Sequence, residues 1–362
     1  MIMYRRASDG AKRRYRLGTY PAMSLEQARK EARAIVAKVD KGLDPSAERD
    51  AIKAESVFSD LADDYVDRYA KKHRRSWQED VRRLKTSINP AIGSIRASQV
   101  SETEVIRLHD AVTDRGAPIE ANRQVALIRR IYSWAIGRRL LSANPAEKLE
   151  WNPETSRDRV LDVAELRRFW SSIDTAGISP GTRLALKLLL LTGQRAGEIT
   201  GCKVDELDLK RMAWLIPGER TKNGLAHSLP LSAWTCELFT EALENSKDGF
   251  VFPSRTGEGP MTRRALSRAV SRNLEIMELA HFTPHDLRRT VASQMAAAGI
   301  DRLVVGKVLN HASIDRDSVT GLVYDRHGYE PEKRRALEKW ADRLAEIVDS
   351  ETGDTPKVVQ LR

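Results

Sequence analysis

The stretch of sequence that says most about the fold and its use reads TPHDLRRT, from Thr283 to Thr290. Threonine is a favoured N-cap and proline is favoured at the first helical position, so Thr283 and Pro284 predict the start of a helix. His285 and Arg288 then lie one turn apart on the same face of that helix. An imidazole and a guanidinium on one helix face are suited to holding a phosphate.

Three further segments of the C-terminal half carry residues of the same kind. Each one alone has an ordinary explanation: an arginine after a helix commonly forms a surface ion pair, a single histidine is commonly structural, and a lysine in a turn is commonly solvated. Together and in order, the four segments favour a site that handles phosphate. The other three are Thr192–Ile199 with Arg195, Thr221–Gly224 with Lys222, and Leu309–His311 followed by Tyr324.

Composition limits the class of protein. The 362 residues include 61 Lys and Arg against 51 Asp and Glu, a net charge of +10 that favours a polyanionic partner. Two cysteines exclude a disulfide framework and a cysteine-rich metal site. The longest apolar stretch, Leu184–Leu191, is interrupted by Lys187 and is far too short to span a membrane; the first residues hold no apolar signal core. We therefore expect a soluble, multidomain protein of a reducing compartment.

Residues 1–52 are expected to form a strand hairpin followed by a helix. Asp9-Gly10 is a turn pair between two short alternating segments. The helix should run from Leu25 to Lys41, because Ser24 and Gln27 form a capping box and apolar residues recur at helical spacing after them.

Residues 53–150 have a helical pattern throughout. Capping boxes are predicted at Ser76 with Glu79 and at Ser101 with Glu104, and loops at Asn89-Pro90 and Gly116–Pro118. The polar stretch Asn152–Asp158 then reads as a linker between domains.

Residues 158–349 are expected to form a mixed, mostly helical domain with a small antiparallel sheet, followed by a flexible tail over 350–362. Strands at Met212–Pro217 and His227–Leu231 are joined through Lys222-Asn223-Gly224, since Asn-Gly is typical of a tight hairpin. The last helix should span Glu330–Val348. The predicted fold class is therefore mainly α, of the α+β type.

In their order, the four segments resemble the catalytic set of the tyrosine recombinase (phage integrase) family, which is Arg, Lys, His-x-x-Arg, His or Trp, and Tyr. The similarity is strongest at Thr192–Ile199 and His285–Ser293. Residues 53–150 are similar to the helical core DNA-binding domain of this family. Arg14–Arg49 is similar to the arm-binding domain of prophage and genomic-island integrases, and residues 1–52 are expected to form a partial arm-type domain without its first strands.

Two further departures from the family pattern concern the end of the catalytic set. Asn310 stands where the family usually has glycine, and the gap from His311 to Tyr324 is a few residues longer than is commonest. Tyr329 is therefore a competing nucleophile. Tyr324 is favoured because the segment after it already has the pattern that begins the last helix.

The resemblance implies a site-specific recombinase that cleaves and rejoins DNA through a covalent 3′-phosphotyrosine, integrating or excising a prophage or genomic island. Such transesterification needs no metal ion, cofactor or ATP, because the arginines neutralise the phosphate and the ester conserves the bond energy. Glu198 is expected to position Arg195, Arg289 to pair with an acid, and His281 to be a surface residue. The implied catalytic residues are Arg195, Lys222, His285, Arg288, His311 and Tyr324.

Basic side chains of the two N-terminal parts are candidate DNA contacts, although a solvated hairpin or helix face would have the same pattern. The family further implies double-stranded DNA attachment sites, a homo-tetramer on DNA and an accessory DNA-bending protein as partners, without a membrane. It implies a bacterial cytoplasmic location at the nucleoid. The candidate contacts are Arg13, Arg14, Lys71, Lys72, Arg74, Arg75 and Arg82.

Three alternatives and one structural hypothesis stay open at this point. A type IB topoisomerase shares the chemistry, and a non-catalytic DNA-binding remnant or regulator could derive from an integrase. A metal-dependent nuclease or transposase is disfavoured because no carboxylate cluster with metal-ligand spacing stands out. The apolar stripe of the last helix, at Leu337, Trp340, Leu344 and Ile347, is predicted to dock on a neighbouring protomer, with packing inside its own subunit as the alternative.

Overall fold

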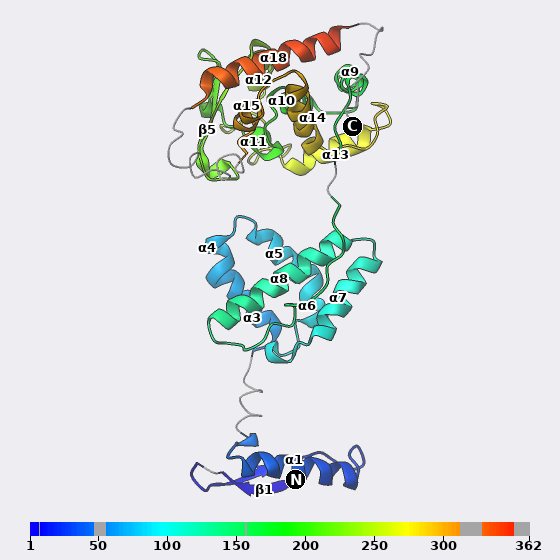
Figure 1. Ribbon diagram of the computed structural model, residues 1–362, viewed down its shortest axis with the longest axis vertical. Coiled ribbons are helices and arrows are strands. Elements are labelled where there is room, and N and C mark those ends of the chain that lie inside the picture. Colours follow the sequence, from blue (N-terminus) through cyan, green and yellow to red (C-terminus); the bar gives the residue numbers. More distant parts are fainter. Residues whose placement is uncertain (7, 47–55, 156–157, 312–327, 351–362) are drawn as a thin grey trace. The chain divides into compact units, whose positions relative to one another are not determined.

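The computed structural model describes residues 1–6, 8–46, 56–155, 158–311 and 328–350. The chain forms two compact units, Met1–Ser156 and Arg157–Arg362, both rich in helices (Figure 1). Small antiparallel sheets accompany the helices in each unit. This is the mainly α, α+β class that the sequence predicts.

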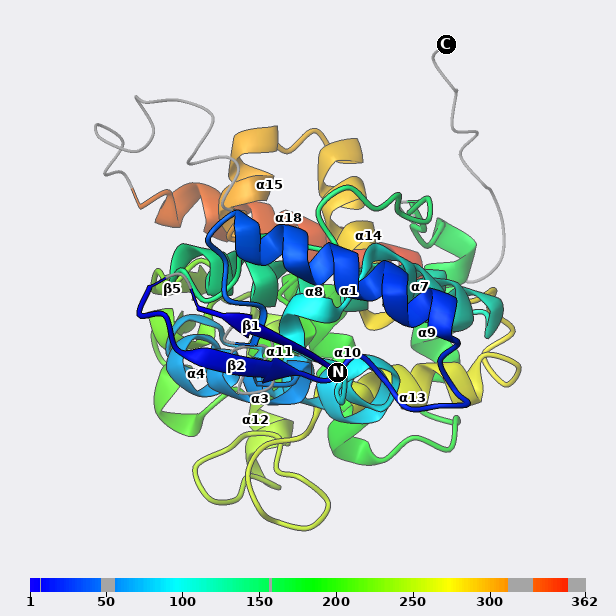
Figure 2. The same ribbon diagram turned by 90° about the horizontal axis from the view of Figure 1, so that it is seen from below.

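The N-terminal residues form a two-stranded sheet beside one helix (Figure 2). Strands β1 (Ile2–Arg5) and β2 (Lys12–Tyr15) pair antiparallel across the predicted Asp9-Gly10 turn, in which Gly10 has a positive φ of 69°. Helix α1 (Leu25–Asp40) begins at the predicted capping box of Ser24 and Gln27. The buried Tyr4 hydroxyl accepts a hydrogen bond from the Ser46 amide at 3.0 Å, which ties β1 to the chain after α1.

Residues 58–137 form a helical bundle around one apolar core. Helices α3 and α7 both pack against the long α8, which runs through the middle of the bundle (Figure 1). The core includes Phe58, Tyr65, Ile88, Leu127 and Tyr132, all essentially inaccessible to solvent. The helices are α3 (Phe58–Tyr65), α4 (Lys71–His73), α5 (Trp77–Arg83), α6 (Asn89–Ile92), α7 (Glu102–Asp114) and α8 (Pro118–Gly137), with π-helical turns at Val66–Ala70 and Leu84–Ile88 and a 3₁₀ turn at Ala97–Gln99.

Two local predictions for this bundle are wrong. Asn89-Pro90 is not a loop, because the chain is helical there and Pro90 lies in the first turn of α6. The preceding π-helical turn lets the chain continue into α6. Ser76 precedes α5 without a side-chain cap, since Glu79 instead accepts a hydrogen bond from Arg82 at 2.7 Å. The capping box of Ser101 and Glu104 is confirmed.

The predicted linker begins later than its composition suggests. The Asn152 side chain donates to the Thr113 hydroxyl at 2.8 Å, and the Asn152 amide donates to Asn122 Oδ1 at 2.9 Å. Glu154 forms an ion pair with Arg123 at 2.8 Å. Residues 152–154 therefore belong to the helical bundle, while residues 156 and 157 of the predicted linker lie outside the described residues.

The second unit is built around α10 (Pro180–Thr192), a helix with apolar residues on nearly all sides. Helices α11, α12, α13, α14 and α18 contact it, so its Leu184–Leu191 stretch forms the centre of the core. The surrounding helices are α9 (Val163–Ser172), α11 (Ala196–Thr200), α12 (Ala233–Leu243), α13 (Arg263–Asn273), α14 (Pro284–Ala297), α15 (Arg302–Val308) and α18 (Glu330–Asp349).

Gly193 ends α10 in the left-handed conformation, with φ at 65°. A Cβ atom built there would lie 2.8 Å from Leu309 Cδ2 and 3.0 Å from Val291 Cγ1. Only glycine therefore lets the chain leave α10 so close to α14 and to the residue after α15. This approach fixes the direction in which the next residues, Gln194 and Arg195, enter the site.

The three-stranded sheet contains β3 (Leu207–Asp208), β4 (Ala213–Ile216) and β5 (His227–Pro230), in that order. The predicted pairing of the last two strands is confirmed, with Ile216 opposite His227. The prediction of a tight hairpin turn at Asn223-Gly224 is wrong, because residues 217–226 form a longer loop with a 3₁₀ turn at Gly218–Arg220. Strand β3 was not predicted from the sequence, since two residues give no periodic signal.

The last helix packs inside its own subunit. Leu337, Trp340, Leu344 and Ile347 of α18 are all buried in the core of the second unit. The Trp340 indole N–H donates to the Leu190 carbonyl of α10 at 2.9 Å. The hypothesis that this stripe docks on a neighbouring protomer is therefore wrong, and the alternative of packing within the subunit holds.

Candidate active site

Arg195 is held in place by Glu198, as the sequence predicts. Arg195 precedes α11 in an extended conformation, and its amide donates to Glu198 Oε2 at 2.8 Å. Its guanidinium Nη1 donates to Glu198 Oε1, also at 2.8 Å. Because Glu198 is buried, one carboxylate fixes both the backbone and the direction of the arginine side chain.

Arg288 enters the same region from α14 and is only 3% exposed. Its Nη1 donates to the Gly193 carbonyl at 2.8 Å, and its Nη2 donates to the Leu309 carbonyl. Burial, together with the nearby charge of Arg195, lowers the pKa of Arg288 to about 10. Burying a charged guanidinium in this way costs free energy unless an opposite charge binds to it. The arrangement is thus poised to receive an anion.

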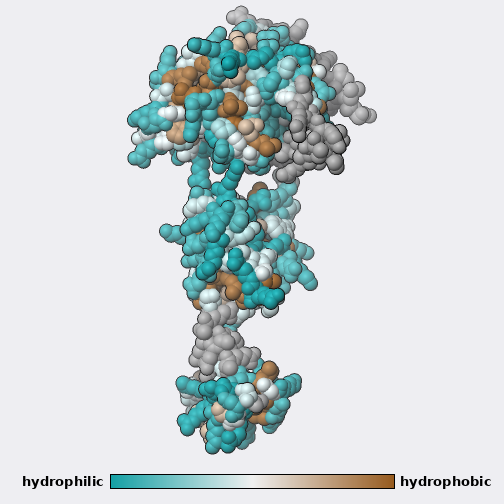
Figure 3. Space-filling view, turned by 90° about the vertical axis from the view of Figure 1, so that its left-hand side faces the viewer, coloured by the Kyte–Doolittle hydropathy of each residue, from teal (hydrophilic) through white to brown (hydrophobic). Residues whose placement is uncertain are grey.

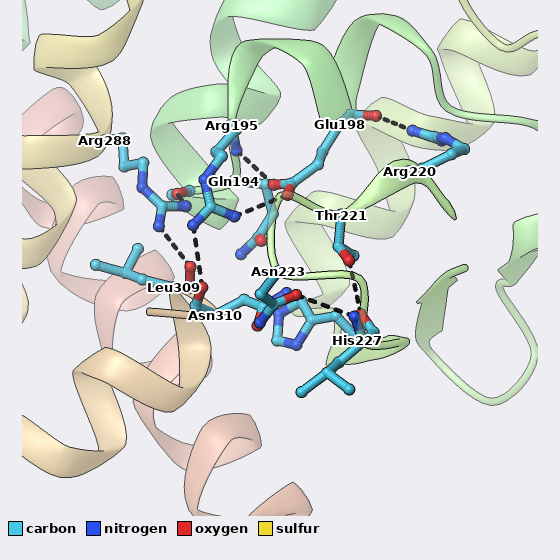
Figure 4. A network of polar contacts seen from close by, with 12 residues as sticks. Gln194, Arg195, Glu198, Arg220, Thr221, Asn223, His227, Arg288, Leu309 and Asn310 are labelled. Carbon is cyan, nitrogen blue, oxygen red and sulfur yellow. Dashed lines mark hydrogen bonds and ion pairs between the residues drawn. The ribbon is translucent and has the colours of Figure 1, made fainter. Parts of the chain in front are cut away.

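The two arginines meet at the segment that follows α15 (Figure 4). Arg195 Nη2 donates to the Asn310 carbonyl at 3.0 Å, beside the Leu309 carbonyl that accepts from Arg288. Adjacent carbonyls of one short segment therefore orient both guanidiniums, from residues that are far apart in sequence. Two forked donors so placed match the non-bridging oxygens of a phosphodiester.

Asn310 adopts the left-handed conformation, with φ at 50°. Glycine reaches this region without strain and asparagine is the side chain that tolerates it best. This accounts for asparagine at a position where the resembled family usually has glycine.

Lys222 lies in the long loop between β4 and β5 and is exposed. Its neighbour Thr221 is buried, with its hydroxyl bonded to the Gly218 and Leu225 carbonyls at 3.0 and 2.8 Å. Asn223, on the other side, donates to Asn310 Oδ1 at 2.6 Å. Residues on both sides of the lysine are therefore anchored, and the lysine side chain itself faces solvent.

The two predicted histidines, His285 and His311, lie in the electric field of these cations. Burial and the positive charges of Arg289 and Arg288 lower the pKa of His285. Burial and the charges of Arg288 and Arg195 lower the pKa of His311. Both shifts favour the neutral form of the ring at pH 7, and each histidine is partly covered by protein while keeping an exposed side. The site has an excess of positive charge, which a bound polyanion would relieve.

Three residues that support the site were missed in the sequence. The buried Gln194 and His227 both approach the Val308 carbonyl, at 2.9 and 3.1 Å, and burial lowers the pKa of His227 to about 4. Arg220 pairs with the buried Glu206 at 2.7 Å and donates to the Glu198 carbonyl. Gln194 stands directly before Arg195 and could have been suspected, whereas Arg220 and His227 give no local signal.

Two neighbouring residues behave as ordinary structure. Arg289 pairs with Asp286 at 3.1 Å, as predicted, and His281 is exposed.

Tyr329 directly precedes α18, and its ring lies 5.2 Å from Lys307 Nζ. Tyr324 lies outside the described residues. Among the residues that the structure describes, no three His, Cys, Asp or Glu side chains are grouped to hold a metal ion.

The candidate DNA contacts of the first unit differ in how they are held. Cross-strand partners share a face, so Arg13 lies on the face of the buried Tyr4, while Arg14 lies on that of the exposed Met3. Polar side chains cover much of the helical bundle in the view of Figure 3.

In the bundle, ion pairs hold three of the candidate contacts. Arg74 pairs with the buried Asp80 at 2.8 Å, Arg82 with Glu79 at 2.7 Å, and Lys71 with Asp67 at 2.7 Å. Glu79 raises the pKa of Arg82 through their hydrogen bond. Lys72 and Arg75 are exposed.

Comparison with known proteins agrees with this geometry. A model described as the phage integrase family matches residues 159–320, one described as the phage integrase central domain matches 58–152, and one described as an arm DNA-binding domain matches 1–52. The chain belongs to the phage integrase family. As a phage integrase, a tyrosine recombinase, it is a DNA strand-transferring enzyme.

Relatives of this phage integrase match over most of their length. Prophage integrase IntA of Escherichia coli (strain K12) is 27% identical over 350 residues, which are 92% of this chain and 82% of the relative. Prophage integrase IntZ of the same organism is 24% identical over 343 residues, 92% of this chain and 83% of the relative.

Among solved structures, a lambda integrase dimer bound to a COC′ core site has the same fold. The TM-score is 0.62 at 16% identity, and the match covers 98% of this phage integrase and 95% of that chain. In the part of the chain that the structure describes, no helix is both long and apolar enough to cross a membrane.

Proposed function

We propose that this recombinase integrates or excises a prophage or genomic island, with Tyr324 as the nucleophile that forms a 3′-phosphotyrosine. The observation that carries the proposal is the convergence of Arg195 and Arg288 on the carbonyls of Leu309 and Asn310. Burial and the charges of Arg288 and Arg195 lower the pKa of His311, and the positive charge of these two arginines is what a phosphodiester would neutralise.

The proposed reaction exchanges one phosphate ester for another. The Tyr324 oxygen bonds to phosphorus while the bond from phosphorus to the 5′ oxygen breaks, and the electron pair leaves with that oxygen. Arg195 and Arg288 bind the non-bridging oxygens, on which charge increases in the transition state. Arginine suits this role because its planar fork stays charged and binds bidentately.

Proton transfer is assigned to the remaining residues. The Lys222 ammonium gives a proton to the departing 5′ oxygen as general acid. His285 and His311 hydrogen-bond the phosphate or take the tyrosine proton, for which a ring that is neutral at pH 7 is required.

We further propose that the enzyme acts as a homo-tetramer on double-stranded attachment sites, assisted by a DNA-bending protein. A lambda integrase tetramer bound to a Holliday junction covers 88% of this chain, with a TM-score of 0.61 at 17% identity. The proposed division is an arm-type domain over 1–52, a core-binding domain over 53–150 and a catalytic domain over 158–349. Of the predicted tail over 350–362, only Ser350 is described.

The test is covalent trapping on a nicked suicide substrate in the presence of EDTA. The wild-type chain should form an adduct through the 3′-phosphate, and chelator should not reduce it because the arginines supply the positive charge. Tyr324→Phe keeps the ring but removes the attacking oxygen, so it should bind DNA and form no adduct.

Tyr329→Phe is the matched control and should form the adduct at the wild-type rate. Peptide mapping of DNA to Tyr329 would move the nucleophile. A wild-type chain without any adduct would support the non-catalytic remnant, and relaxation of supercoils by isolated monomers would favour the topoisomerase alternative.

A further inference from the structure

A hydrogen bond joins the loop that carries Lys222 to the segment that orients the two arginines. Asn223, the residue after Lys222, donates from Nδ2 to Asn310 Oδ1 at 2.6 Å (Figure 4). Asn310 is the residue before His311. The bond thus connects the immediate neighbours of two proposed catalytic residues that are 89 positions apart in sequence.

Asn310 is the firmly held partner of this pair. Its carbonyl accepts from Arg195 Nη2 at 3.0 Å, and its amide donates to the Lys307 carbonyl at 3.3 Å. The His311 amide, next in the chain, donates to the Gly306 carbonyl at 3.0 Å. The Asn310 side chain therefore starts from a backbone that α15 and Arg195 both fix.

The position of Asn223 depends on its hydrogen bond to Asn310 more than the position of Asn310 depends on that bond. It lies within the ten-residue connection 217–226, next to the exposed Lys222 and Gly224. Its own Oδ1 accepts from the Leu225 amide at 3.2 Å, so the side chain turns within the loop while Nδ2 reaches Asn310. A lysine on such a loop has many conformations, and only a few bring its ammonium to a given oxygen.

The left-handed backbone conformation at position 310 does not require an asparagine side chain. At φ of 50°, glycine would be at least as favourable, because its lack of Cβ removes the strain of the left-handed region. The side chain that stands there is the one that accepts from Asn223. Its contact with the Lys222 loop is therefore separable from the folding of the turn.

We propose that Asn223 and Asn310 form a latch that positions Lys222 for protonation of the 5′ leaving oxygen. The inference rests on the proposed function and adds two positioning residues to it. The latch ties the lysine loop to the same segment that orients Arg195 and Arg288, so that acid and phosphate clamp share one reference point. Holding the acid in the reactive geometry raises the rate of its proton transfer.

The test compares cleavage of two substrates by Asn223→Ala, Asn310→Gly and the double variant. One substrate has the ordinary 5′ oxygen at the scissile phosphate and the other has a bridging 5′ sulfur, which leaves without an acid. On the oxygen substrate, each variant should cleave about tenfold or more slowly in single turnover, since a positioned general acid contributes roughly 10²–10⁴-fold. On the sulfur substrate, all three should match the wild type within about twofold.

Two further measurements separate the latch from a general structural effect. The double variant should be no slower than the slower single variant, because both changes remove one bond. Asn310→Gly should unfold at the wild-type temperature or above it, because the left-handed strain is relieved. Leu225→Ala, an exposed change in the same loop, is the control and should cleave both substrates normally.

Equal slowing on both substrates would overturn the latch, because the defect would then not lie in leaving-group protonation. Unchanged cleavage of the oxygen substrate by the variants would overturn it as well. Failure of the wild-type chain to form an adduct on either substrate would instead contradict the proposed function itself, which distinguishes the two cases.

Discussion

Arg288 is the residue whose setting is most demanding, because its charge is almost entirely withdrawn from water. Replacing it with lysine keeps the charge but loses the fork that spans Gly193 and Leu309. We expect Arg288→Lys to cleave a suicide substrate at least ~10²-fold more slowly, comparable to the loss of one preorganised oxyanion donor. Arg289→Lys, which changes the adjacent arginine paired with Asp286, should stay near the wild-type rate. Similar losses in both variants would contradict the assignment.

His227 should make the second unit sensitive to acid. Its pKa is about 4 in the folded chain and 6.5 as the reference value, so the unfolded chain binds the proton more tightly. The contribution of the neutral His227 ring to the free energy of unfolding is fully present above pH 6.5 and is lost as the pH falls toward 4. At pH 5 this corresponds to about 2 kcal/mol of unfolding free energy relative to pH 7.

Urea unfolding at pH 7 and pH 5 checks this prediction. His227→Gln keeps a side-chain donor for the Val308 carbonyl and removes the titration, so its loss of stability between the two pH values should be smaller than that of the wild type. An identical loss in both proteins would show that other groups cause the acid sensitivity.

At the scale of elements, α18 should be a structural helix of the second unit. Trp340 is fully buried and its indole donates to α10, so Trp340→Ala should lower the free energy of unfolding by about 3–5 kcal/mol. Glu338→Ala, on the exposed side of the same helix, should stay within about 0.5 kcal/mol. Chemical denaturation of dilute protein measures both. A stable Trp340→Ala that fails only in the pairing of two DNA sites would revive docking on a neighbour.

The elements that sequence predicts well are those whose causes are local. The capping boxes at Ser24 and Ser101 and the Arg195–Glu198 pair each involve residues three positions apart, so their partners can be read directly. The fold class and the apolar stripe of α18 follow from periodicity.

The remaining features depend on tertiary placement. Ser76 has a capping-box sequence, yet Glu79 accepts a hydrogen bond from Arg82 instead. The apolar stripe of α18 would have the same sequence pattern whether it packed in the core of its own subunit, as it does, or on the surface of a partner. The contacts of Arg288 with Gly193 and Leu309, and of Asn223 with Asn310, join segments that only the folded chain brings together. The π-helical turn at Leu84–Ile88 has no sequence signal that we recognise.

At the scale of the whole molecule, binding at distal DNA sites should be separable from cleavage. Deleting residues 1–52 removes the exposed arginines of β2 and the matched arm domain, and should weaken affinity at distal sites with a smaller salt dependence, because fewer phosphates are neutralised. Cleavage at the core site should persist, since Arg195, Lys222 and Arg288 all lie in the second unit. Footprinting over a range of salt concentrations tests this. Equal loss of protection at distal and core sites would refute the separation.

Gly193 has a consequence for how this sequence can drift. A methyl group there would press on Leu309, the residue whose carbonyl receives Arg288, so even alanine would disturb packing and catalysis together. Gly224 also has a positive φ, but no atom lies within 4 Å of the Cβ it lacks. In a saturation library selected for recombination, position 193 should therefore retain glycine alone, while position 224 should also admit asparagine. Two glycines that both have a positive φ would therefore differ in the substitutions that the selected genes tolerate.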